Sequence, residues 1–486
     1  MSNRTYDVQA DVVVIGYGAA GAASAITAHD NGASVILLEK MREGGGNSRV
    51  FGGNIAIASS MEFADYLDKI TFGSTDRETI QTFVEGNLKL KDWIAKLGGE
   101  LQPFVALKVL YPATKSKGDV SFPGLRGSET VRRYNLKGPE ECPCDRMWRL
   151  ISSNVERRAI KVLTGMPARD LIKSQQGEVE GVIAESEGKT LAIKARKGVI
   201  LCCGGFENDE AMKFDCLGVK HIKFVGNPGN TGDGIRMAQK VGAGMWHLNR
   251  SATNIGFQAP GFEAAFYIFF SDVGFLYVDQ LGRRFLNETY ADPYEYASVL
   301  SNFDDREFRY PRIPFYAVMD EAVMRAGRLA YGTAGYNKNL YRWSLDNKAE
   351  VDKGWITRSR NLSELAKQIA VAESALANTV NTYNSYCGAL KDPDFGRAKE
   401  NLKEIHPPFY AIKLWPTILN TQGGPRRDKE ARVLDPDGKP IPRLYSAGEI
   451  GSIWGFRYQT ATNMAECLVF GQIAGRNASN NSAIVD

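Results

Sequence analysis

The sequence predicts an α/β protein whose main part is a Rossmann-type nucleotide-binding domain. Three observations lead to this prediction. Residues 11–40 read in order as an apolar strand, a glycine turn, a helix and a second apolar strand. Two more apolar strands run into glycines, near residues 204 and 448. The chain of 486 residues also exceeds the roughly 250 to 300 that one hydrophobic core usually supports, so we expect a second domain.

The first segment, DVVVIGYGAAGAASAITAHDNGASVILLEK, joins a five-residue apolar strand to an alanine-rich helix through three glycines. Such glycines permit a tight turn and a close approach of the backbone to a pyrophosphate, while the helix N-terminus supplies partial positive charge. The second strand ends in a carboxylate 18 residues after the last glycine, where it can accept hydrogen bonds from a ribose. The predicted dinucleotide-binding residues of this segment are Gly16, Gly18, Ala19, Ala20, Gly21, Glu39 and Lys40.

The region after Glu39 favours FAD over NAD as the dinucleotide. EGGGNSRVFGGNIA is a second glycine-rich loop, where a nicotinamide-dependent dehydrogenase would normally continue into another helix. Paired short strands near Ala168, an apolar strand ending at residues 204–205, and IPRLYSAGEIG near the C-terminus complete one FAD site. The sequence has no second G-x-G-x-x-G for a pyridine nucleotide. These segments add Gly45, Gly46, Asn47, Ser48, Gly52, Gly53, Ala168, Gly204, Gly205, Gly448 and Glu449 to the predicted cofactor site.

Composition excludes several other classes of protein. A net charge of +4 with interspersed signs gives no reason to expect a nucleic-acid groove. The seven cysteines form no C-x-x-C pair and the four histidines are scattered, so we predict no metal site. The first ten residues lack the features of a signal peptide, and no run approaches the ~20 apolar residues of a membrane span. We therefore expect a cytoplasmic protein with no membrane span.

Six motifs together resemble the fumarate reductase and succinate dehydrogenase flavoprotein superfamily, which includes the 3-ketosteroid dehydrogenases. They are GYGAAGAASA, GGNSRVFGGN, NPGNTGDGIRMAQKVGA, GRRFLNE, PPFYAIKLWPTILNTQGG and LYSAGEIGSIWG. The resemblance implies an FAD-binding domain made from residues 1–250 and 406–486, with an inserted α+β capping domain over residues 251–405. It also implies that Asp233, Asn463 and Met464 contribute to the cofactor site. The histidine that carries covalent flavin in some relatives is missing from Glu43–Ser60, so we expect FAD to be bound non-covalently.

The substrate residues differ from those of the dicarboxylate branch. Where fumarate reductases place histidines and arginines, this sequence has Asn254, a segment from Tyr290 to Tyr294 without arginine, Leu419 with Asn420, and Tyr458. An anionic diacid would lose charge-assisted hydrogen bonds worth ~1.5 to 3 kcal/mol each. The pattern is closest to the 3-ketosteroid 4-dehydrogenases, which pair a tyrosine with a hydroxyl two residues later.

By this resemblance, Tyr458 and Thr460 donate hydrogen bonds to a ketone oxygen and stabilise the enolate that develops there. The alternative is that Tyr458 only packs, with its hydroxyl bonded to a backbone carbonyl. Proton transfer at the alpha carbon is assigned to Tyr290 first and Tyr294 second, just past the N-E motif, with Asp292 as a third candidate.

The sequence therefore predicts an FAD-dependent oxidoreductase that moves a hydride between flavin N5 and the carbon beta to a ketone, with a tyrosine transferring the alpha proton. Its partners would be a small apolar ketone or enone, steroids included, and a separate electron acceptor or donor. An alternative is a fumarate- or urocanate-reductase-like enzyme acting on an unsaturated acid, for which Arg457 and Arg426 are the nearby cations. A third hypothesis is a flavin-binding subunit without turnover.

Overall fold

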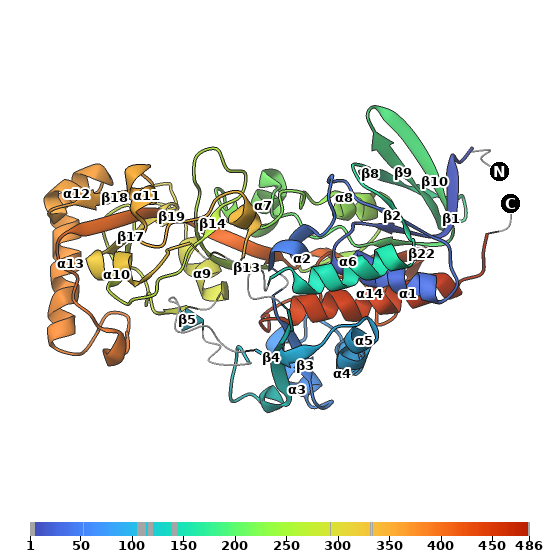
Figure 1. The fold of residues 1–486 in the computed structure, drawn as a ribbon, viewed down its shortest axis with the longest axis horizontal. Helices are drawn as coiled ribbons and strands as arrows, with labels where there is room; N and C mark the ends of the chain where they lie inside the picture. Colours follow the sequence, from blue (N-terminus) through green and yellow to red (C-terminus); the bar gives the residue numbers. More distant parts are fainter. Residues whose placement is uncertain are drawn as a thin grey trace.

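The computed structural model describes residues 5–51, 53–104, 113–114, 120–138, 144–291, 293–330, 332 and 334–484. The molecule is elongated, with a nucleotide-binding region at one end and a second sheet with its helices at the other (Figure 1). Both ends of the chain lie at the nucleotide-binding end. In the described part, no helix is long and apolar enough to cross a membrane, and no cluster of histidine, cysteine and carboxylate side chains is suited to a metal ion.

The first sheet has the parallel core of a nucleotide-binding fold. Its main order is β21-β22-β10-β1-β2-β7, and an antiparallel β8-β9 hairpin extends from β10. β1, β2, β7, β10 and β22 are parallel to their neighbours in this core. The strands are β1 (Val8–Ile15), β2 (Val35–Leu38), β7 (Lys161–Leu163), β8 (Ala168–Lys173), β9 (Val179–Ser186), β10 (Lys189–Leu201), β21 (Arg432–Leu434) and β22 (Pro440–Ser446).

Alternating residues of β1 bury both faces of this sheet. Val12 and Val14 pack with one core cluster, and Val13 and Ile15 pack with another. Because successive side chains of a strand point to opposite faces, a strand covered on both sides is apolar throughout. The first face is covered by α1 (Ala19–Asp30), α6 (Arg146–Arg157) and α14 (Thr462–Asn480), and the second by α8 (Asp233–Lys240).

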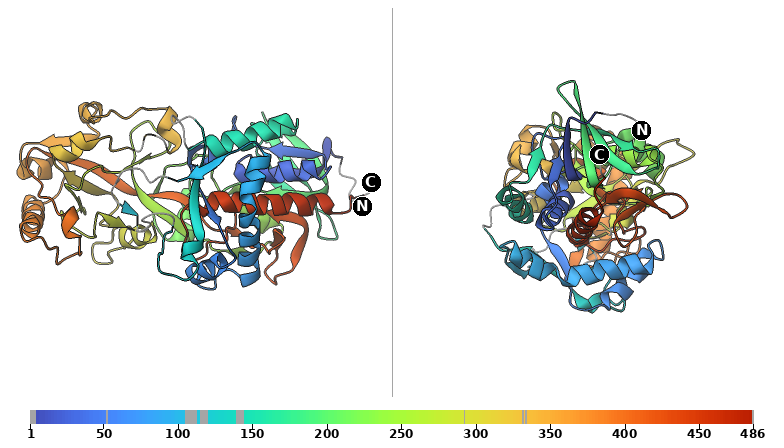
Figure 2. Two further views of the ribbon diagram at one scale, coloured as in Figure 1. Left: turned by 60° about the horizontal axis from the view of Figure 1, so that its bottom comes forward. Right: turned by 90° about the vertical axis from the view of Figure 1, so that its right-hand side faces the viewer.

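Helices α1 and α14 come from opposite ends of the chain and pack side by side (Figures 1 and 2). Glycines on α14 permit the close approach. A β-carbon at Gly475 would lie 2.3 Å from the Ser24 carbonyl oxygen, and one at Gly471 would lie 2.8 Å from the Ala20 carbonyl oxygen. The alanine-rich sequence of α1 is therefore explained by packing against α14.

A smaller sheet lies below the first, with helices beside it (Figure 1). Its order is β3-β6-β4, with every pair antiparallel. The elements here are α2 (Gly46–Phe51), β3 (Ile55–Ala58), α3 (Phe63–Thr71), α4 (Arg77–Leu88), α5 (Leu90–Lys96), β4 (Leu101–Pro103), η1 (Ser128–Thr130) and β6 (Val131–Leu136).

The second large sheet forms the other end of the molecule. Its order is β14-β13-β19-β17-β15, and β11 and β18 also pair with β19. Its strands are β11 (Lys223–Phe224), β13 (Ser251–Phe257), β14 (Phe266–Tyr267), β15 (Phe275–Val278), β17 (Phe315–Met319), β18 (Ile356–Ser359) and β19 (Phe409–Thr421). The helices are α7 (Glu210–Leu217), α9 (Pro293–Leu300), α10 (Glu321–Ala326), η2 (Tyr336–Asn339), α11 (Lys348–Asp352), α12 (Leu362–Gln368), α13 (Glu373–Gly388) and η3 (Lys399–Asn401).

Strand β19 joins the two ends of the molecule. It runs from the second sheet towards the nucleotide-binding region and pairs with β13, β17 and β18 along the way (Figure 1). The sequence analysis places residues 409–421 in the FAD-binding domain, whereas three of their strand partners, β13, β17 and β18, belong to the inserted region and only β11 does not. Two further pairs, β12 (Met245–Trp246) with β20 (Gly424–Pro425) and β5 (Ala113–Thr114) with β16 (Tyr290–Ala291), complete the strand pairing.

Candidate active site

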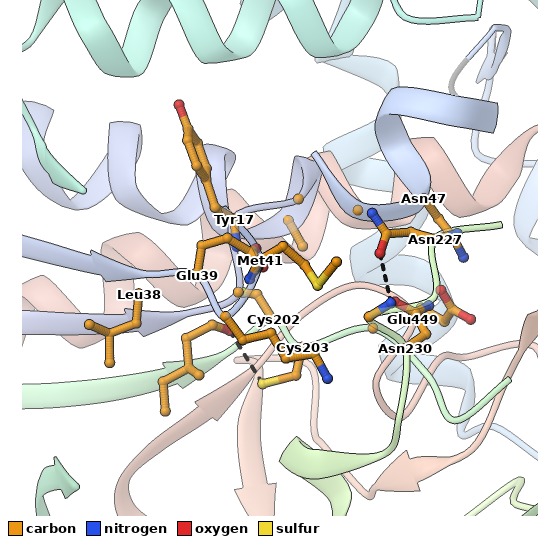
Figure 3. Close-up of a pocket in the computed structure, with 18 of the residues that line it drawn as sticks. Tyr17, Leu38, Glu39, Met41, Asn47, Cys202, Cys203, Asn227, Asn230 and Glu449 are labelled. Atoms are coloured by element: carbon orange, nitrogen blue, oxygen red, sulfur yellow. Dashed lines mark hydrogen bonds between the residues drawn. The ribbon is translucent and has the colours of Figure 1, made fainter. Parts of the chain in front are cut away.

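A cleft of about 820 Å³ opens at the carboxyl end of the parallel strands, where open α/β sheets bind their ligands (Figure 3). It receives residues from the ends of β1, β2 and β10, from the start of α2, and from the loop after β22. Thirteen residues predicted for the cofactor line it: Gly16, Gly18, Ala19, Ala20, Glu39, Lys40, Gly46, Asn47, Ser48, Ala168, Gly204, Asp233 and Glu449.

The glycines of the first turn are required by close backbone contacts. A β-carbon at Gly16 would lie 2.3 Å from the Cys202 carbonyl oxygen, and Gly16 has a φ of 103°. A β-carbon at Gly21 would lie 1.9 Å from the Gly16 carbonyl oxygen. A β-carbon at Gly18, which lies between them, would come no closer than 3.7 Å to the Gly45 carbonyl oxygen and Ser48 Oγ, so the backbone of Gly18 stays open towards the cleft. The turn therefore leaves space at the N-terminus of α1, where a diphosphate binds favourably.

Glu39 lies at the end of β2 with its side chain in the cleft (Figure 3). One carboxylate oxygen accepts the Tyr17 N–H at 2.9 Å, and the other accepts the Met41 N–H at 2.8 Å. Burial raises the pKa of this carboxyl group, and the two backbone N–H groups act in the opposite direction. Each oxygen retains a second lone pair, so Glu39 can accept from a ribose while it orders the glycine turn.

Other predicted residues bind one another across the cleft. Lys40 Nζ donates to Thr231 Oγ1 at 2.5 Å and to Asp233 Oδ2 at 2.6 Å. Ser48 Oγ accepts the Ala19 N–H at 3.0 Å. Asn47 Oδ1 accepts the Asn227 N–H at 3.0 Å (Figure 3). The second glycine loop is thereby fixed to both the first turn and the segment before α8.

The remaining predicted cofactor residues do not line this cleft. Gly205 packs against Thr421, and a β-carbon at Gly448 would lie 2.8 Å from the Ala20 β-carbon. Gly53 lies in the loop before β3, Asn463 and Met464 begin α14, and Gly52 is outside the described residues. Gly21 and Gly45 lie beside the cleft, where the Gly45 N–H donates to the Tyr17 carbonyl oxygen at 2.6 Å. These positions stay predictions as ligand contacts.

Sequence reasoning missed other residues that line the cleft. Asn227, Gly229 and Asn230 belong to NPGNTGDG, from which only Asp233 was chosen, so the signal was present. The side chains at the turn and on the strand ends had no signal of their own, because any apolar residue satisfies the strand pattern. They include Tyr17, Met41, Met166, Cys202 and Cys203; Cys467 of α14 also lines the cleft.

Tyr458 lies in the loop before α14, outside this cleft. Its hydroxyl oxygen accepts the Ala461 N–H at 3.0 Å, and its ring packs edge-on against Trp454. The packing alternative expected this hydroxyl to donate to a backbone carbonyl, but the bond runs in the other direction. Burial raises the pKa of Tyr458 to about 12, while the Asn463 and Ala461 N–H groups and the charge of Arg133 act to lower it. Tyr458 is therefore a neutral phenol at neutral pH.

Thr460 has a partner inside the protein. Its hydroxyl lies 3.0 Å from Ser121 Oγ, which also accepts the Thr460 N–H at 3.0 Å. Between the two predicted residues, the buried Gln459 accepts bonds from the Tyr66 hydroxyl at 2.5 Å and from the Ser121 N–H at 3.0 Å. These contacts fix the loop to the segment around Ser121 and to α3.

The predicted proton-transfer residues lie at the inserted end of the molecule. The backbone of Tyr290 belongs to β16 and pairs with Ala113 of β5, and Tyr294 is in the first turn of α9. The side chains of both tyrosines lie outside the described residues, as does Asp292. The pairing of β16 with β5 places this segment beside Ala113 and Thr114.

The buried cation near Tyr458 is not one of the two arginines, Arg426 and Arg457, that the sequence analysis names for an enzyme acting on an unsaturated acid. Arg426 is exposed, and Arg457 contacts the Phe456 ring at 4.5 Å. Arg133 is instead only 8% exposed and lies over the Phe104 ring at 4.2 Å, and its charge lowers the pKa of Tyr458. Its strand β6 pairs at this residue with Ala56, whose N–H donates to the Ala461 carbonyl oxygen at 2.9 Å. A buried cation thus lies near the tyrosine.

Comparisons with known proteins identify the class. The family described as "FAD binding domain" matches residues 11–464, so the chain belongs to that family. The predicted superfamily, the α/β fold and the FAD cofactor are confirmed, whereas non-covalent attachment stays a prediction. The cleft fits this cofactor, because the glycine turn, the N-terminus of α1 and the Glu39 carboxylate meet in it.

Three similar proteins illustrate the range of the family. The chain is 26% identical to the NADH:acrylate oxidoreductase of Vibrio harveyi over 99% of its own length, but it spans only 51% of that protein. It is 24% identical to the vinyl phenol reductase of Lactiplantibacillus plantarum, covering 97% of this chain and 96% of that one. The crystal structure of the 3-ketosteroid Δ1-dehydrogenase of Sterolibacterium denitrificans shares the fold, with a TM-score of 0.80, 23% identity and coverage of 97% and 99%.

Proposed function

We propose that this protein is an FAD-dependent oxidoreductase that transfers a hydride between flavin N5 and the carbon beta to a ketone. FAD, when bound, supplies the hydride chemistry. The chain's own residues bind the ketone oxygen, hold the alpha proton and exclude water. We include in the proposal a small apolar ketone or enone as substrate, a separate electron acceptor or donor, and a cytoplasmic location.

The bonding of Tyr458 carries the proposal. Its oxygen accepts the N–H of Ala461, the residue directly before α14. Among the described residues, its own proton has no hydrogen-bond acceptor. A phenol that uses its oxygen as an acceptor in this way still has its own proton to donate to a ligand. The N–H bond and the positive end of α14 stabilise negative charge on the phenol oxygen, so the donor becomes stronger as charge develops on the ketone oxygen.

Thr460 has a supporting place in this mechanism. Its hydroxyl and the Ser121 hydroxyl share one hydrogen bond, which uses only one of their two protons, so the other O–H can still donate to a ligand. We assign the main polarisation to Tyr458 and a supporting hydrogen bond to this hydroxyl pair. Tyr290, with Tyr294 as the second choice, remains the proposed group that moves the alpha proton.

A second candidate function is supported by Arg133. Acrylate, named for one relative, is an unsaturated carboxylate, whereas vinyl phenol, named for the other, has no carboxylate. A buried guanidinium near Tyr458 offers the cation that an unsaturated acid requires. The same charge would also stabilise the enolate of a ketone, so Arg133 is compatible with both functions.

An anaerobic screen distinguishes the two functions. The purified holoprotein is mixed with saturated apolar ketones, and its dithionite-reduced form is mixed with enones or with unsaturated acids, while flavin absorbance is followed. We expect ketones to bleach the oxidised flavin and enones to reoxidise the reduced flavin, with little response to acids. Reoxidation by acids alone, lost in Arg133→Gln, would establish the second function. No response to any compound would favour the flavin-binding subunit.

A further inference from the structure

Two carboxylates meet at one end of the FAD cleft. Glu207 follows β10 and Glu449 follows β22, and these strands are parallel neighbours with Leu201 opposite Ser446. The carboxyl ends of adjacent parallel strands lie at the same edge of a sheet, so both segments reach the cleft. Glu207 is fully buried, and Glu449 lines the cleft beside Asn230 (Figure 3).

A single backbone donor lies between the two carboxylates. The Thr421 N–H is 3.1 Å from Glu207 Oε1 and 3.0 Å from Glu449 Oε1. A β-carbon at Gly205 would be 2.7 Å from both Glu207 Oε2 and Glu449 Oε1, so these oxygens are at most twice that distance apart. Asn230 Nδ2 donates to Glu207 Oε2 at 3.1 Å. The absence of a side chain at Gly205 is what permits the two groups to converge.

The cation nearest to this carboxylate pair is Lys213, whose buried ammonium group attracts Glu207 but forms its ion pair with Glu210 at 2.6 Å. Lys40 bonds Asp233, and Arg427 bonds Glu466, and within the described part of the chain neither cation forms an ion pair with Glu207 or Glu449. The titratable groups that face the cleft around the pair are Glu39, Lys40, Asp233, Cys202, Cys203, Cys467 and Tyr17. Two neighbouring carboxylates that have no ion-pair partner of their own repel each other, which opposes a negative charge on both.

The direction of the Glu449 titration agrees with this geometry. Burial, and then the neighbouring Glu207, raise the pKa of Glu449 well above its ordinary value, and the bond from the Thr421 N–H only partly opposes this. Burial also raises the pKa of Tyr17 and of Cys202 to about 12, and it raises those of Cys203 and Cys467. These four groups therefore stay neutral between about pH 6 and 9.

We propose that Glu207 is a positioning residue that shares one proton with Glu449 and thereby permits the cleft to bind FAD tightly. FAD carries two negative charges on its diphosphate, and Glu39 and Asp233 already line the cleft. A second charge on the pair would oppose the binding of this anion in a partly buried site. The inference concerns cofactor binding, so it does not depend on which substrate is reduced or oxidised.

The test is the dissociation constant of FAD, measured by flavin fluorescence on the apoprotein between about pH 6 and 9. For the unaltered protein we expect the constant to rise with pH, approaching tenfold per unit once the pair releases its proton. Glu207→Gln and Glu449→Gln each remove one carboxylate, so their constants should stay flat over this range. Glu373→Gln, at an exposed carboxylate of α13 at the other end of the molecule, is the control and should keep the original profile.

Thermal unfolding of the apoproteins provides a second readout. A carboxyl group whose folded pKa is raised destabilises the fold as pH rises from the ordinary carboxyl pKa to the raised one, because the unfolded chain releases its proton first. Glu207→Gln should therefore be at least as stable as the unaltered protein at neutral pH, whereas a purely structural glutamate would lower the unfolding temperature. The proposal is overturned if FAD affinity does not change with pH in the unaltered protein, or if both glutamine variants keep its pH profile.

Discussion

The FAD cleft and the region around Tyr458 are built in different ways. The cleft consists largely of backbone: a glycine turn, a helix N-terminus and loops joined by N–H bonds to Glu39, Ser48 and Asn47. The region around Tyr458 consists of side chains from segments far apart in the sequence, such as Ser121 and Gln459. The comparison teaches that the FAD cleft is shaped mainly by backbone geometry, whereas the region proposed to bind the substrate is shaped by a few side chains.

The largest effect is expected at Gly21, where a substitution tests whether the backbone geometry of the glycine turn is required for FAD binding. In Gly21→Val, the first side-chain carbon would lie 1.9 Å from the Gly16 carbonyl oxygen, a clash that no rotamer relieves. We expect loss of FAD binding and a fall in the free energy of unfolding of more than about 4 kcal/mol, measured by flavin content and urea denaturation. Gly388→Ala, where no atom lies within 4 Å, is the control and should be close to neutral.

The next effect concerns proton transfer. If Tyr290 moves the alpha proton, Tyr290→Phe should slow exchange of that proton with solvent by ~10² to 10⁴, the usual contribution of a general acid or base. The measurement is deuterium incorporation into a bound ketone, followed by NMR. Tyr294→Phe serves as the matched comparison. If Tyr294→Phe alone slows exchange, the two assignments are reversed. If both variants exchange the alpha proton as fast as the unaltered protein, neither tyrosine transfers it.

Removal of the Tyr458 hydroxyl should lower turnover without changing FAD binding, and so distinguish the roles of the two regions. We expect Tyr458→Phe to lower turnover by ~10² to 10³, the scale of one donor to a developing oxyanion, with flavin content unchanged. The matched control is Tyr310→Phe, because the Tyr310 hydroxyl donates to the Gly218 carbonyl oxygen away from both regions. Loss of FAD in Tyr458→Phe would show that the regions are not independent.

Substitutions of Glu39 test whether its carboxylate binds the ribose of FAD. Glu39→Ala removes a ribose acceptor and leaves two backbone N–H groups without their carboxylate, so FAD affinity should fall by ~10 to 100 fold, about 1 to 3 kcal/mol. Glu39→Gln keeps one carbonyl acceptor and should lose less. Fluorescence titration of the apoproteins gives both values, and full flavin occupancy of Glu39→Ala after dilution would contradict the assignment.

The smallest effect is expected at Thr460. Thr460→Val should lower turnover by less than about tenfold, because Tyr458 and the Ser121 hydroxyl beside Thr460 both remain as donors. Steady-state kinetics would check this, with Ser121→Ala measured in parallel. A loss as large as that of Tyr458→Phe would show that Thr460 is an equal donor to the ketone.

The same division explains what the sequence predicted. Gly16, Gly18 and Glu39 form a local motif whose spacing indicates its own geometry, so the fold, the cofactor and thirteen of the residues that line the cleft could be predicted from the sequence. The partners of Thr460 and the charge of Arg133 near Tyr458 depend on contacts across more than 300 residues, and no pattern reports them. The pairing of β19 with the inserted sheet was missed for the same reason, because strand partners are tertiary contacts.

The central claim is that Tyr458 donates a hydrogen bond to a ketone oxygen. The most direct measurement is the carbonyl stretching frequency of a ketone that carries ¹³C at the carbonyl carbon, bound to the holoprotein and read by difference infrared spectroscopy. Our account predicts a frequency below that of the ketone in water, which returns towards the value in an apolar solvent in Tyr458→Phe while the ketone still binds. The same frequency in both proteins would contradict it, because the ketone would then take its hydrogen bond from another group.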